Sequence, residues 1–312
     1  MSFSNEVRNE IARIIPAKEC CRKAELSAML LSIGPQLKYQ DENKPILQAI
    51  VSNAASARKI FKLLKQNYHL TPSVNIGRQR GFNKNRIFEV NTSFSPGQVW
   101  ILEELGITDR GKINWKLVTR NCCKRAFIRG TFLCRGFINR PESEYHLELV
   151  LNDTKMASGI KKILKKYHLE AQMIERKSNI VLYIKESEKI VDFLRIIESH
   201  KGVLQFENVR ILKSMRNQVN RQVNCETANL SKTINASLRQ IEFIKELINS
   251  KGWEKLPQQI KELAILRIEH PDYTLKELGM MIDPPLSKSG VAYRMRKLED
   301  LAEKINGQNP KV

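Results

Sequence analysis

Four of the six cysteines stand in two adjacent pairs, Cys20-Cys21 and Cys122-Cys123. Thiolates bind soft metal ions, so two such pairs brought together could form a four-thiolate site. The pairs lack the C-x-x-C spacing of zinc sites, and adjacent cysteines bridge poorly with each other on geometric grounds. We therefore predict small buried residues here, with no metal and no cofactor, and keep the four-thiolate site as the alternative interpretation.

Two histidines recur in similar surroundings, His69 within Tyr68-His69-Leu70 and His168 within Tyr167-His168-Leu169. Both fall at the ends of predicted helices, which favours packing or capping over catalysis. The sequence contains no P-loop, GxGxxG, GxSxG or HExxH motif, so nothing in it supports a nucleotide-binding or hydrolase site. The protein is predicted not to be an enzyme.

The cysteine and histidine matches belong to a longer internal repeat. Cys20 to Ala24 returns as Cys122 to Ala126, and the segment Ile60 to Lys65 returns as Ile160 to Lys165. Several matches in the same order indicate two copies of one unit, over residues about 20–105 and 122–205.

Each copy has the pattern of an α+β half-domain. Strands are predicted at 46–51 and 86–90 in the first copy and at 145–151 and 180–184 in the second. Helices are predicted at 57–68 and 155–167, and a further helix opens each copy. Small residues recur every fourth position on both opening helices, which predicts a close helix–helix seam across a pseudo-two-fold axis; they are Ala24, Ala28, Ser32, Ala126, Gly130 and Cys134.

The C-terminal region has a different pattern. Residues 212–226 are rich in Asn, Gln and Arg and are interpreted as a linker between a duplicated domain over 1–211 and a helical domain over 227–312. Apolar residues spaced by three and four then predict helices over about 230–252 and from Pro257 onward. Thr274 and Glu277 have the form of a capping box, and a serine precedes the last helix.

A short helix, a tight turn and a basic amphipathic helix over 274–305 form a helix-turn-helix pattern. The predicted core residues of the last helix are Val291, Met295, Leu298 and Ala302. The opposite side is predicted to bind DNA, with base contacts from Tyr293 and Arg296 and with two lysines nearer to phosphate. This candidate set is Lys288, Ser289, Ala292, Tyr293, Arg296 and Lys297.

The charge favours a nucleic-acid partner. The 312 residues carry 53 Lys+Arg against 33 Asp+Glu, a net charge of +20, and the double-stranded DNA backbone is the natural polyanion for such an excess. An anionic membrane is disfavoured because no basic amphipathic helix with exposed aromatic residues stands out. Residues 213–312 hold 17 basic and 12 acidic residues, so +15 of the excess lies in residues 1–212.

Composition and the N-terminus place the chain among folded cytosolic proteins. With 42% hydrophobic and 28% charged residues, the sequence is neither collagen-like nor wholly disordered. Charged residues interrupt segment 1–15, so no signal peptide is predicted, and no apolar run reaches the roughly 18 residues of a membrane span. We expect a cytoplasmic, nucleoid-associated protein.

Segments 26–34 (LSAMLLSIG) and 128–136 (IRGTFLCRG) resemble degenerate copies of the LAGLIDADG motif of homing endonucleases. The resemblance implies two helices at a central seam and sheets that form a saddle over DNA. In those enzymes an acidic residue before the closing glycine binds the catalytic metal, but here the positions hold Ile33 and Arg135. Neither can bind Mg²⁺, so nuclease activity is predicted to be lost. If the sheets face DNA, the candidate backbone contacts are Arg78, Arg80, Lys84, Arg86, Arg176, Lys177 and Lys185.

The combination of a duplicated LAGLIDADG-like domain with a helix-turn-helix resembles the WhiA regulators of bacteria, over nearly all of the chain. The strings that carry the resemblance are 1–11 (MSFSNEVRNEI), 124–130 (KRAFIRG), 145–148 (YHLE), 223–229 (VNCETAN) and 283–291 (DPPLSKSGV). One departure is Ala292-Tyr293-Arg294, where family members carry Asn-His-Arg, so the target sequence is not transferred.

The resemblance implies a sequence-specific regulator in cell division, chromosome segregation or sporulation gene control, with other transcription regulators or RNA polymerase as further partners. It also implies that the helix-turn-helix supplies most of the DNA binding, whereas the charge tally favours the repeat. Two alternatives stay open. The first is a nucleoid-associated protein that binds DNA by charge alone, and the second is a residual nuclease that depends on Glu25 or Asp153.

Overall fold

The computed structural model describes residues 2–39, 44–78, 86–108, 111–250 and 252–306. The chain divides into two compact units, Met1–Lys213 and Ser214–Val312. Within the described ranges, no helix combines the length and the apolar character that a membrane crossing requires.

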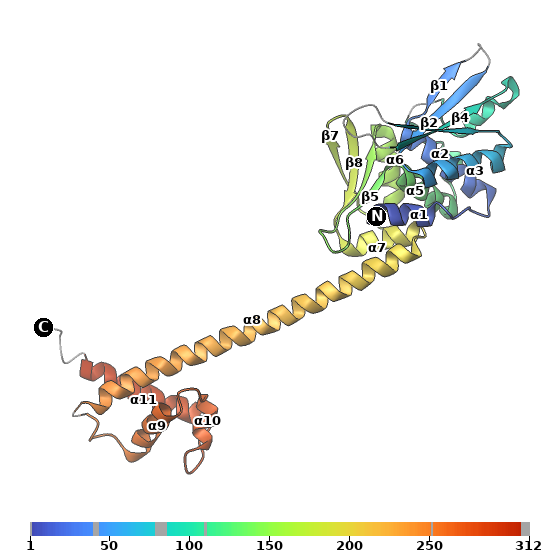
Figure 1. Ribbon diagram of the computed structural model, residues 1–312. Helices are drawn as coiled ribbons and strands as arrows, with labels where there is room; N and C mark the ends of the chain where they lie inside the picture. The colour runs from blue at the N-terminus through green and yellow to red at the C-terminus, as the bar shows by residue number, and fades with distance from the viewer. Residues whose placement is uncertain (1, 40–43, 79–85, 109–110, 251, 307–312) are drawn as a thin grey trace. The chain divides into compact units, whose positions relative to one another are not determined.

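The first unit contains the predicted duplication (Figure 1). Each copy runs helix–strand–strand–helix–strand–strand and folds its strands into one antiparallel sheet. The first copy comprises α2 (Glu19–Ile33), β1 (Gln36–Tyr39), β2 (Pro45–Val51), α3 (Ala54–Tyr68), β3 (Ser73–Arg78) and β4 (Arg86–Ser93). The second comprises α5 (Asn121–Arg135), β5 (Gly136–Ile138), β6 (Leu147–Leu151), α6 (Thr154–Lys165), β7 (Gln172–Arg176) and β8 (Asn179–Ile184).

The two sheets have equivalent strand orders, β1-β2-β4-β3 and β5-β6-β8-β7. This identity of topology confirms the repeat predicted from the sequence. The two histidines also occupy equivalent places, since His69 and His168 follow α3 and α6 with positive φ of 52° and 58°. The backbone N–H of His69 donates to the carbonyl of Lys65 at 3.1 Å, so this residue caps its helix, as predicted.

Alternating side chains explain how each sheet is buried on one face. Leu47, Ala49 and Val51 on β2 are buried, as are Leu147, Leu149 and Leu151 on β6. Their neighbours in the sequence point to the other face, as the period of two requires. The buried residues join one core with the inner faces of α2, α3, α5 and α6.

Shorter elements complete this unit. They are α1 (Phe3–Ile11), α4 (Trp100–Glu104), α7 (Ser187–Ile196) and the 3₁₀ turns η1 (Pro96–Gln98) and η2 (Trp115–Val118). Helix α1 contacts both copies. The Ser4 hydroxyl donates to the carbonyl of Ile138 and accepts from its N–H, at 2.7 Å each, and the carbonyl of Ile11 accepts from Lys59 of α3 at 3.0 Å.

The second unit is helical, with α9 (Gln258–Glu269), α10 (Leu275–Met280) and α11 (Lys288–Asn306). These helices pack with the C-terminal part of α8 (His200–Ile248), where Ile244 and Leu247 are buried. The predicted core residues of α11, Val291, Met295, Leu298 and Ala302, are all at most 5% exposed, which confirms the assignment of its inner face.

The segment 212–226, interpreted as a linker, lies within the continuous helix α8, and the boundary between the two units follows Lys213. The side chains of 214–226 are all exposed, so the scarcity of apolar anchors was identified correctly but does not imply irregular structure. No glycine or proline occurs between Gly202 and Gly252, and Asn, Gln and Arg are compatible with a helix. The apolar residues expected on the following helix are mostly exposed too, with Leu230 at 61% and Leu238 at 54%.

Candidate DNA-binding sites and the seam between the copies

Helices α2 and α5 lie side by side and form the seam between the two copies (Figure 1). A Cβ atom added to Gly130 would lie 2.4 Å from the backbone oxygen of Glu25 and 3.0 Å from the Cβ of Ala28. Ala24 and Ala126 are fully buried one turn earlier on their helices. The stripe of small residues therefore allows the close approach of two backbones, as the sequence predicted.

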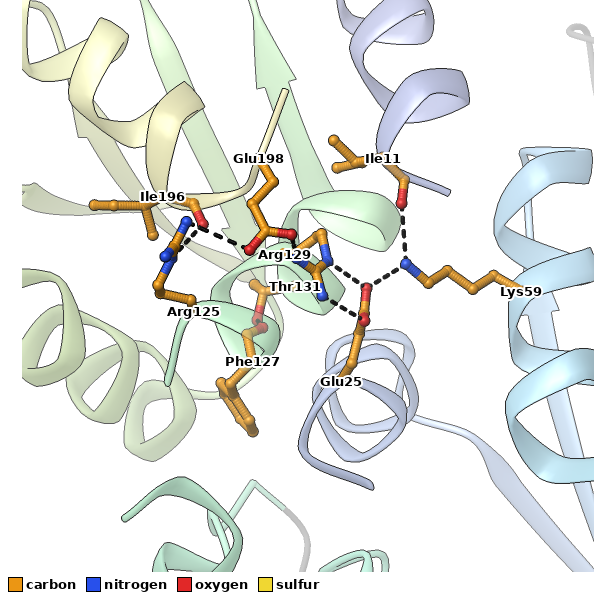
Figure 2. A network of polar contacts seen from close by, with 9 residues as sticks. All are labelled: Ile11, Glu25, Lys59, Arg125, Phe127, Arg129, Thr131, Ile196 and Glu198. Carbon is orange, nitrogen blue, oxygen red and sulfur yellow. Dashed lines mark hydrogen bonds and ion pairs between the residues drawn. The ribbon is translucent and has the colours of Figure 1, made fainter. Parts of the chain in front are cut away.

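A buried ionic network crosses this seam (Figure 2). The Glu25 carboxylate accepts two hydrogen bonds from Arg129, each 3.0 Å long, and lies 2.5 Å from the ammonium group of Lys59. Lys59 also donates to the carbonyl of Ile11 at 3.0 Å, and Arg129 reaches Glu198 at 2.7 Å. The network therefore joins α2, α3, α5 and the segment that follows α7.

Burial dominates the electrostatics of this network. Glu25 and Lys59 have no exposed side-chain surface, and burial lowers the pKa of Lys59 although the Glu25 carboxylate opposes that shift. A buried charge of this kind is tolerated only with a partner in place. The network has no signature in the sequence, because Glu25 and Arg129 are 104 residues apart and no periodicity connects them.

The positions that would bind metal in a LAGLIDADG nuclease hold no carboxylate. Arg135 donates across the seam, from Nε to the carbonyl of Ser32 at 2.9 Å and from Nη2 to the carbonyl of Ile33 at 3.3 Å. Ile33 is half-buried against the core. The two carboxylates considered for a residual nuclease have other partners, since Glu25 belongs to the ionic network and Asp153 caps α6 by accepting from the Met156 N–H at 2.9 Å.

Four of the candidate phosphate-binding residues lie at the turn ends of the corresponding hairpins β3–β4 and β7–β8, and Lys185 lies at the opposite end of the second hairpin. Arg78 and Arg86 are paired across β3 and β4, and both are exposed. Arg176 ends β7 and Lys177 follows it with a positive φ of 58°, again exposed. Lys185 is exposed after β8, with its ammonium 5.6 Å from the Tyr183 ring. The remaining two candidates, Arg80 and Lys84, lie outside the described residues.

The outward faces of the sheets carry carboxylates nearer their centres. Glu89 on β4 accepts hydrogen bonds from Asn91 and Gln48, which lower its pKa. Glu148 on β6 lies 3.3 Å from His146. The basic candidates therefore flank the described part of each face instead of covering it, an arrangement that suits contacts to the DNA backbone at the edges.

Local sequence accounts for the geometry of the helix-turn-helix. The Thr274 side chain accepts from the N–H of Glu277 at 3.3 Å, and the Glu277 carboxylate accepts from the N–H of Thr274 at 2.7 Å, so the predicted capping box begins α10. The Ser287 hydroxyl accepts from the N–H of Gly290 at 3.2 Å and caps α11. Gly279 lets the turn close tightly, because an added Cβ would lie 2.3 Å from the Leu286 backbone oxygen.

The outer side of α11 presents most of its candidate residues to solvent. Lys288, Ser289, Tyr293, Arg296 and Lys297 are exposed, and Ala292 is half-buried. Tyr293 is 61% exposed and lies 5.2 Å from the ammonium group of Lys297.

A surface hollow beside α11 includes one basic residue, Arg239, that is absent from the candidate set predicted from the sequence. The hollow is lined by Ala292 and Arg296 from α11 and by Ala236, Arg239, Gln240 and Phe243 from α8. Arg239 therefore lines the same hollow as Arg296, together with the carboxylate of Glu299. The spacing of the apolar residues in this part of α8 predicts a helix but gives no signal for Arg239 on its polar side.

The four paired cysteines converge at the beginning of the seam. Their sulfur atoms all lie within 4.8 Å of one another, and each thiol is free. Cys21 and Cys123 are buried as predicted, whereas Cys20 and Cys122 are half-buried.

Comparison with known proteins covers almost the whole chain. Three family models match, described as the WhiA N-terminal LAGLIDADG-like domain over residues 19–108, the WhiA LAGLIDADG-like domain over 124–216 and the WhiA C-terminal HTH domain over 219–302. A protein of Syntrophomonas wolfei named "Probable cell division protein WhiA" is 55% identical over 98% of this chain and 99% of its own. A protein of Bacillus velezensis with the same name is 42% identical over 98% and 97%.

One solved structure also matches along the whole length. The crystal structure of full-length DUF199/WhiA from Thermatoga maritima has a TM-score of 0.60 and 23% identity, and the match covers 97% of this chain and 99% of that one. It therefore shares the fold, a pair of LAGLIDADG-like domains followed by a helical domain.

Proposed function

The chain belongs to the WhiA family, and on that premise we propose that it is a sequence-specific DNA-binding regulator without nuclease activity. The helix-turn-helix match and the names of the relatives support a DNA-binding role in cell division. The finer parts of the proposal concern how the chain reads sequence, what the repeat contributes and where the protein acts.

Sequence reading is assigned to α11, and one observation carries this assignment. Val291, Met295 and Leu298 fix the inner side of α11, so Tyr293 and Arg296 are displayed on the opposite side. A guanidinium group can donate two hydrogen bonds to the major-groove edge of guanine. The phenol ring of Tyr293 would contact a base edge or sugar nearby, while Lys288 and Lys297 would contact phosphate.

The repeat is assigned to backbone contacts that position the protein. The exposed basic residues Arg78, Arg86, Arg176 and Lys177 stand at hairpin ends, and Glu89 and Glu148 occupy the outward faces between them. Carboxylates repel phosphates, so the described faces favour contact at their edges. Such contacts raise affinity for every sequence equally and make it sensitive to salt.

The proposed absence of nuclease activity follows from the residues at positions 33 and 135. Ile33 and Arg135 offer no oxygen ligand from their side chains, and the Arg135 guanidinium would repel a divalent cation.

In the cell, the protein would act on the chromosome as a nucleoid-associated regulator. Relatives from several bacteria carry the name "Probable cell division protein WhiA", which supports cell division as the process. Chromosome segregation and sporulation gene control are the related processes implied by the resemblance. A second candidate, sequence-independent chromosome organisation, is favoured by the net charge of +20 and by the basic hairpin ends.

The test compares two single variants of the full-length protein on a duplex enriched by selection and on its scrambled counterpart. Arg296→Ala is expected to weaken binding to the enriched duplex roughly 5- to 100-fold and to relax preference at one base pair. Lys177→Ala is expected to weaken both duplexes equally and to reduce the salt slope by about one. Identical effects of the two variants on both duplexes would contradict the assigned division of roles.

A further inference from the structure

The four paired cysteines lie at equivalent positions in the two copies. Cys20 and Cys21 are in the first turn of α2, and Cys122 and Cys123 are in the first turn of α5. Because the two helices run in the same direction along the seam, these turns meet at one end of it, while Ser32 and Arg135 meet at the other. The cysteines are therefore separate from the positions considered for the nuclease.

The arrangement of the sulfur atoms matches the size of a tetrahedral thiolate site. Zn–S bonds of about 2.3 Å place the sulfur atoms of such a site about 3.8 Å apart. All four sulfur atoms here lie within 4.8 Å of one another, so adjustments of an ångström or less would bring them onto one ion. Packing alone needs no such convergence, since Ala24 and Ala126 fill the next turn of the same seam without any polar atom.

The four cysteines also lie where the helix ends favour anionic ligands. The N-terminal ends of α2 and α5 both carry partial positive charge, which stabilises anionic ligands in the first turn. Arg125 and Arg129 line the same surface hollow as Cys21 and Cys122. Two of the four cysteines therefore border a hollow of the surface.

We propose that Cys20, Cys21, Cys122 and Cys123 bind one zinc ion and thereby clamp the two copies together at the start of the seam. Each thiol transfers its proton to solvent when its sulfur binds the ion, so four protons are released for each Zn²⁺. With two ligands from each copy and no open position, the site is structural. It is independent of the proposed DNA-binding function and uses none of its residues.

The first test measures metal in the full-length protein purified under reducing conditions without a chelator. Elemental analysis is expected to give about one zinc per chain. Protein stripped of metal and loaded with Co²⁺ is expected to show the thiolate-to-cobalt charge-transfer band and the strong visible bands of a tetrahedral site. These spectra report coordination itself, so they do not depend on any variant folding correctly.

Variants then identify the ligands. Cys20→Ser/Cys123→Ser, which removes one thiol from each copy, is expected to abolish the cobalt bands and most of the bound zinc. Cys225→Ser is the matched control, because this cysteine is exposed on α8 and should leave both unchanged. The proposal would be overturned by wild-type protein in which all six cysteines are reduced, if it binds less than about 0.1 Zn²⁺ per chain and shows no tetrahedral cobalt spectrum. Disulfides among these cysteines in freshly reduced and desalted protein would also overturn it.

Discussion

The Nε atom of Arg135 lies 2.9 Å from the carbonyl oxygen of Ser32, on the opposite side of the seam between the two copies. The last carbonyls of a helix carry partial negative charge and have no partner within the helix. Arg135 supplies such a partner to α2 from the end of α5. Arg135, at the position where the LAGLIDADG resemblance implies a lost metal ligand, thus holds the two copies together.

Replacing Arg135 should therefore affect stability. Arg135→Ala is expected to lower the free energy of unfolding by about 1–3 kcal/mol, because two carbonyl groups at the end of α2 lose a charged donor. Urea denaturation of the full chain measures this change. Arg78→Ala, at an exposed hairpin end, is the control and should have little effect. Equal stability of wild type and Arg135→Ala would show that the contact has no structural role.

The proposed loss of nuclease activity gives a separate prediction. Supercoiled plasmid incubated with the wild-type protein and Mg²⁺ should stay intact, because the side chains at positions 33 and 135 offer no oxygen ligand. Gel electrophoresis measures the nicked fraction. Nicking by the wild type that is lost in Glu25→Gln or Asp153→Asn would instead establish a residual nuclease.

The close approach at the seam makes Gly130 sensitive to a single methyl group. Gly130→Ala would place a carbon 2.4 Å from a backbone oxygen and is expected to cost about 1–3 kcal/mol, despite the better helix propensity of alanine. Gly97→Ala is the matched control, since nothing lies within 4 Å of its added Cβ. Thermal unfolding followed by circular dichroism compares the two. A Gly130→Ala protein as stable as Gly97→Ala would mean that the helices are farther apart.

The buried network predicts a larger loss from the removal of one charge. Glu25→Gln leaves Lys59 and Arg129 without their buried carboxylate and is expected to destabilise the protein by about 3–5 kcal/mol. Glu19→Gln removes a carboxylate that is bound to Lys23 at an exposed position, and it should change stability very little. Chemical denaturation measures both. A similar small effect for the two variants would contradict the account of the network.

The capping box of α10 gives a dependence on pH. The pKa of Glu277 lies below its ordinary value of 4.5 because its carboxylate accepts hydrogen bonds from the backbone and side chain of Thr274. Since the folded pKa is the lower one, the stabilisation is complete above 4.5 and is lost as the pH falls through the folded value. Wild type and Glu277→Gln should therefore differ in urea midpoint at neutral pH and converge in acid. A difference that is constant with pH would exclude the carboxylate as its source.

Much of the fold could be predicted because its signals are local or repeated. The offset between Cys20 and Cys122 revealed the duplication, and Thr274 with Glu277 marked the start of α10 by a pattern only three residues long. Gly130 indicates the seam because a spacing of four places it on one helix face with Ala126 and Cys134. Each of these inferences depends on residues that are close in sequence or matched between copies.

The remaining features depend on contacts that no local pattern records. Lys59 and Arg129 look like ordinary surface cations in the sequence, and only the packing of α2, α3 and α5 brings both to Glu25. The full length of α8 is hard to predict for a different reason. Its exposed residues 214–226 have the composition of a linker, although no glycine or proline interrupts the helix there.

The central claim is that α11 reads DNA sequence, and selection from a pool of random duplexes by the full-length protein tests it most directly. At about 150 mM salt, where charge-driven binding is reduced, the account predicts one enriched motif that disappears with Tyr293→Ala/Arg296→Ala. Tight binding with no enriched motif, which weakens steeply as salt is raised, would contradict the claim and favour a sequence-independent organiser of the chromosome.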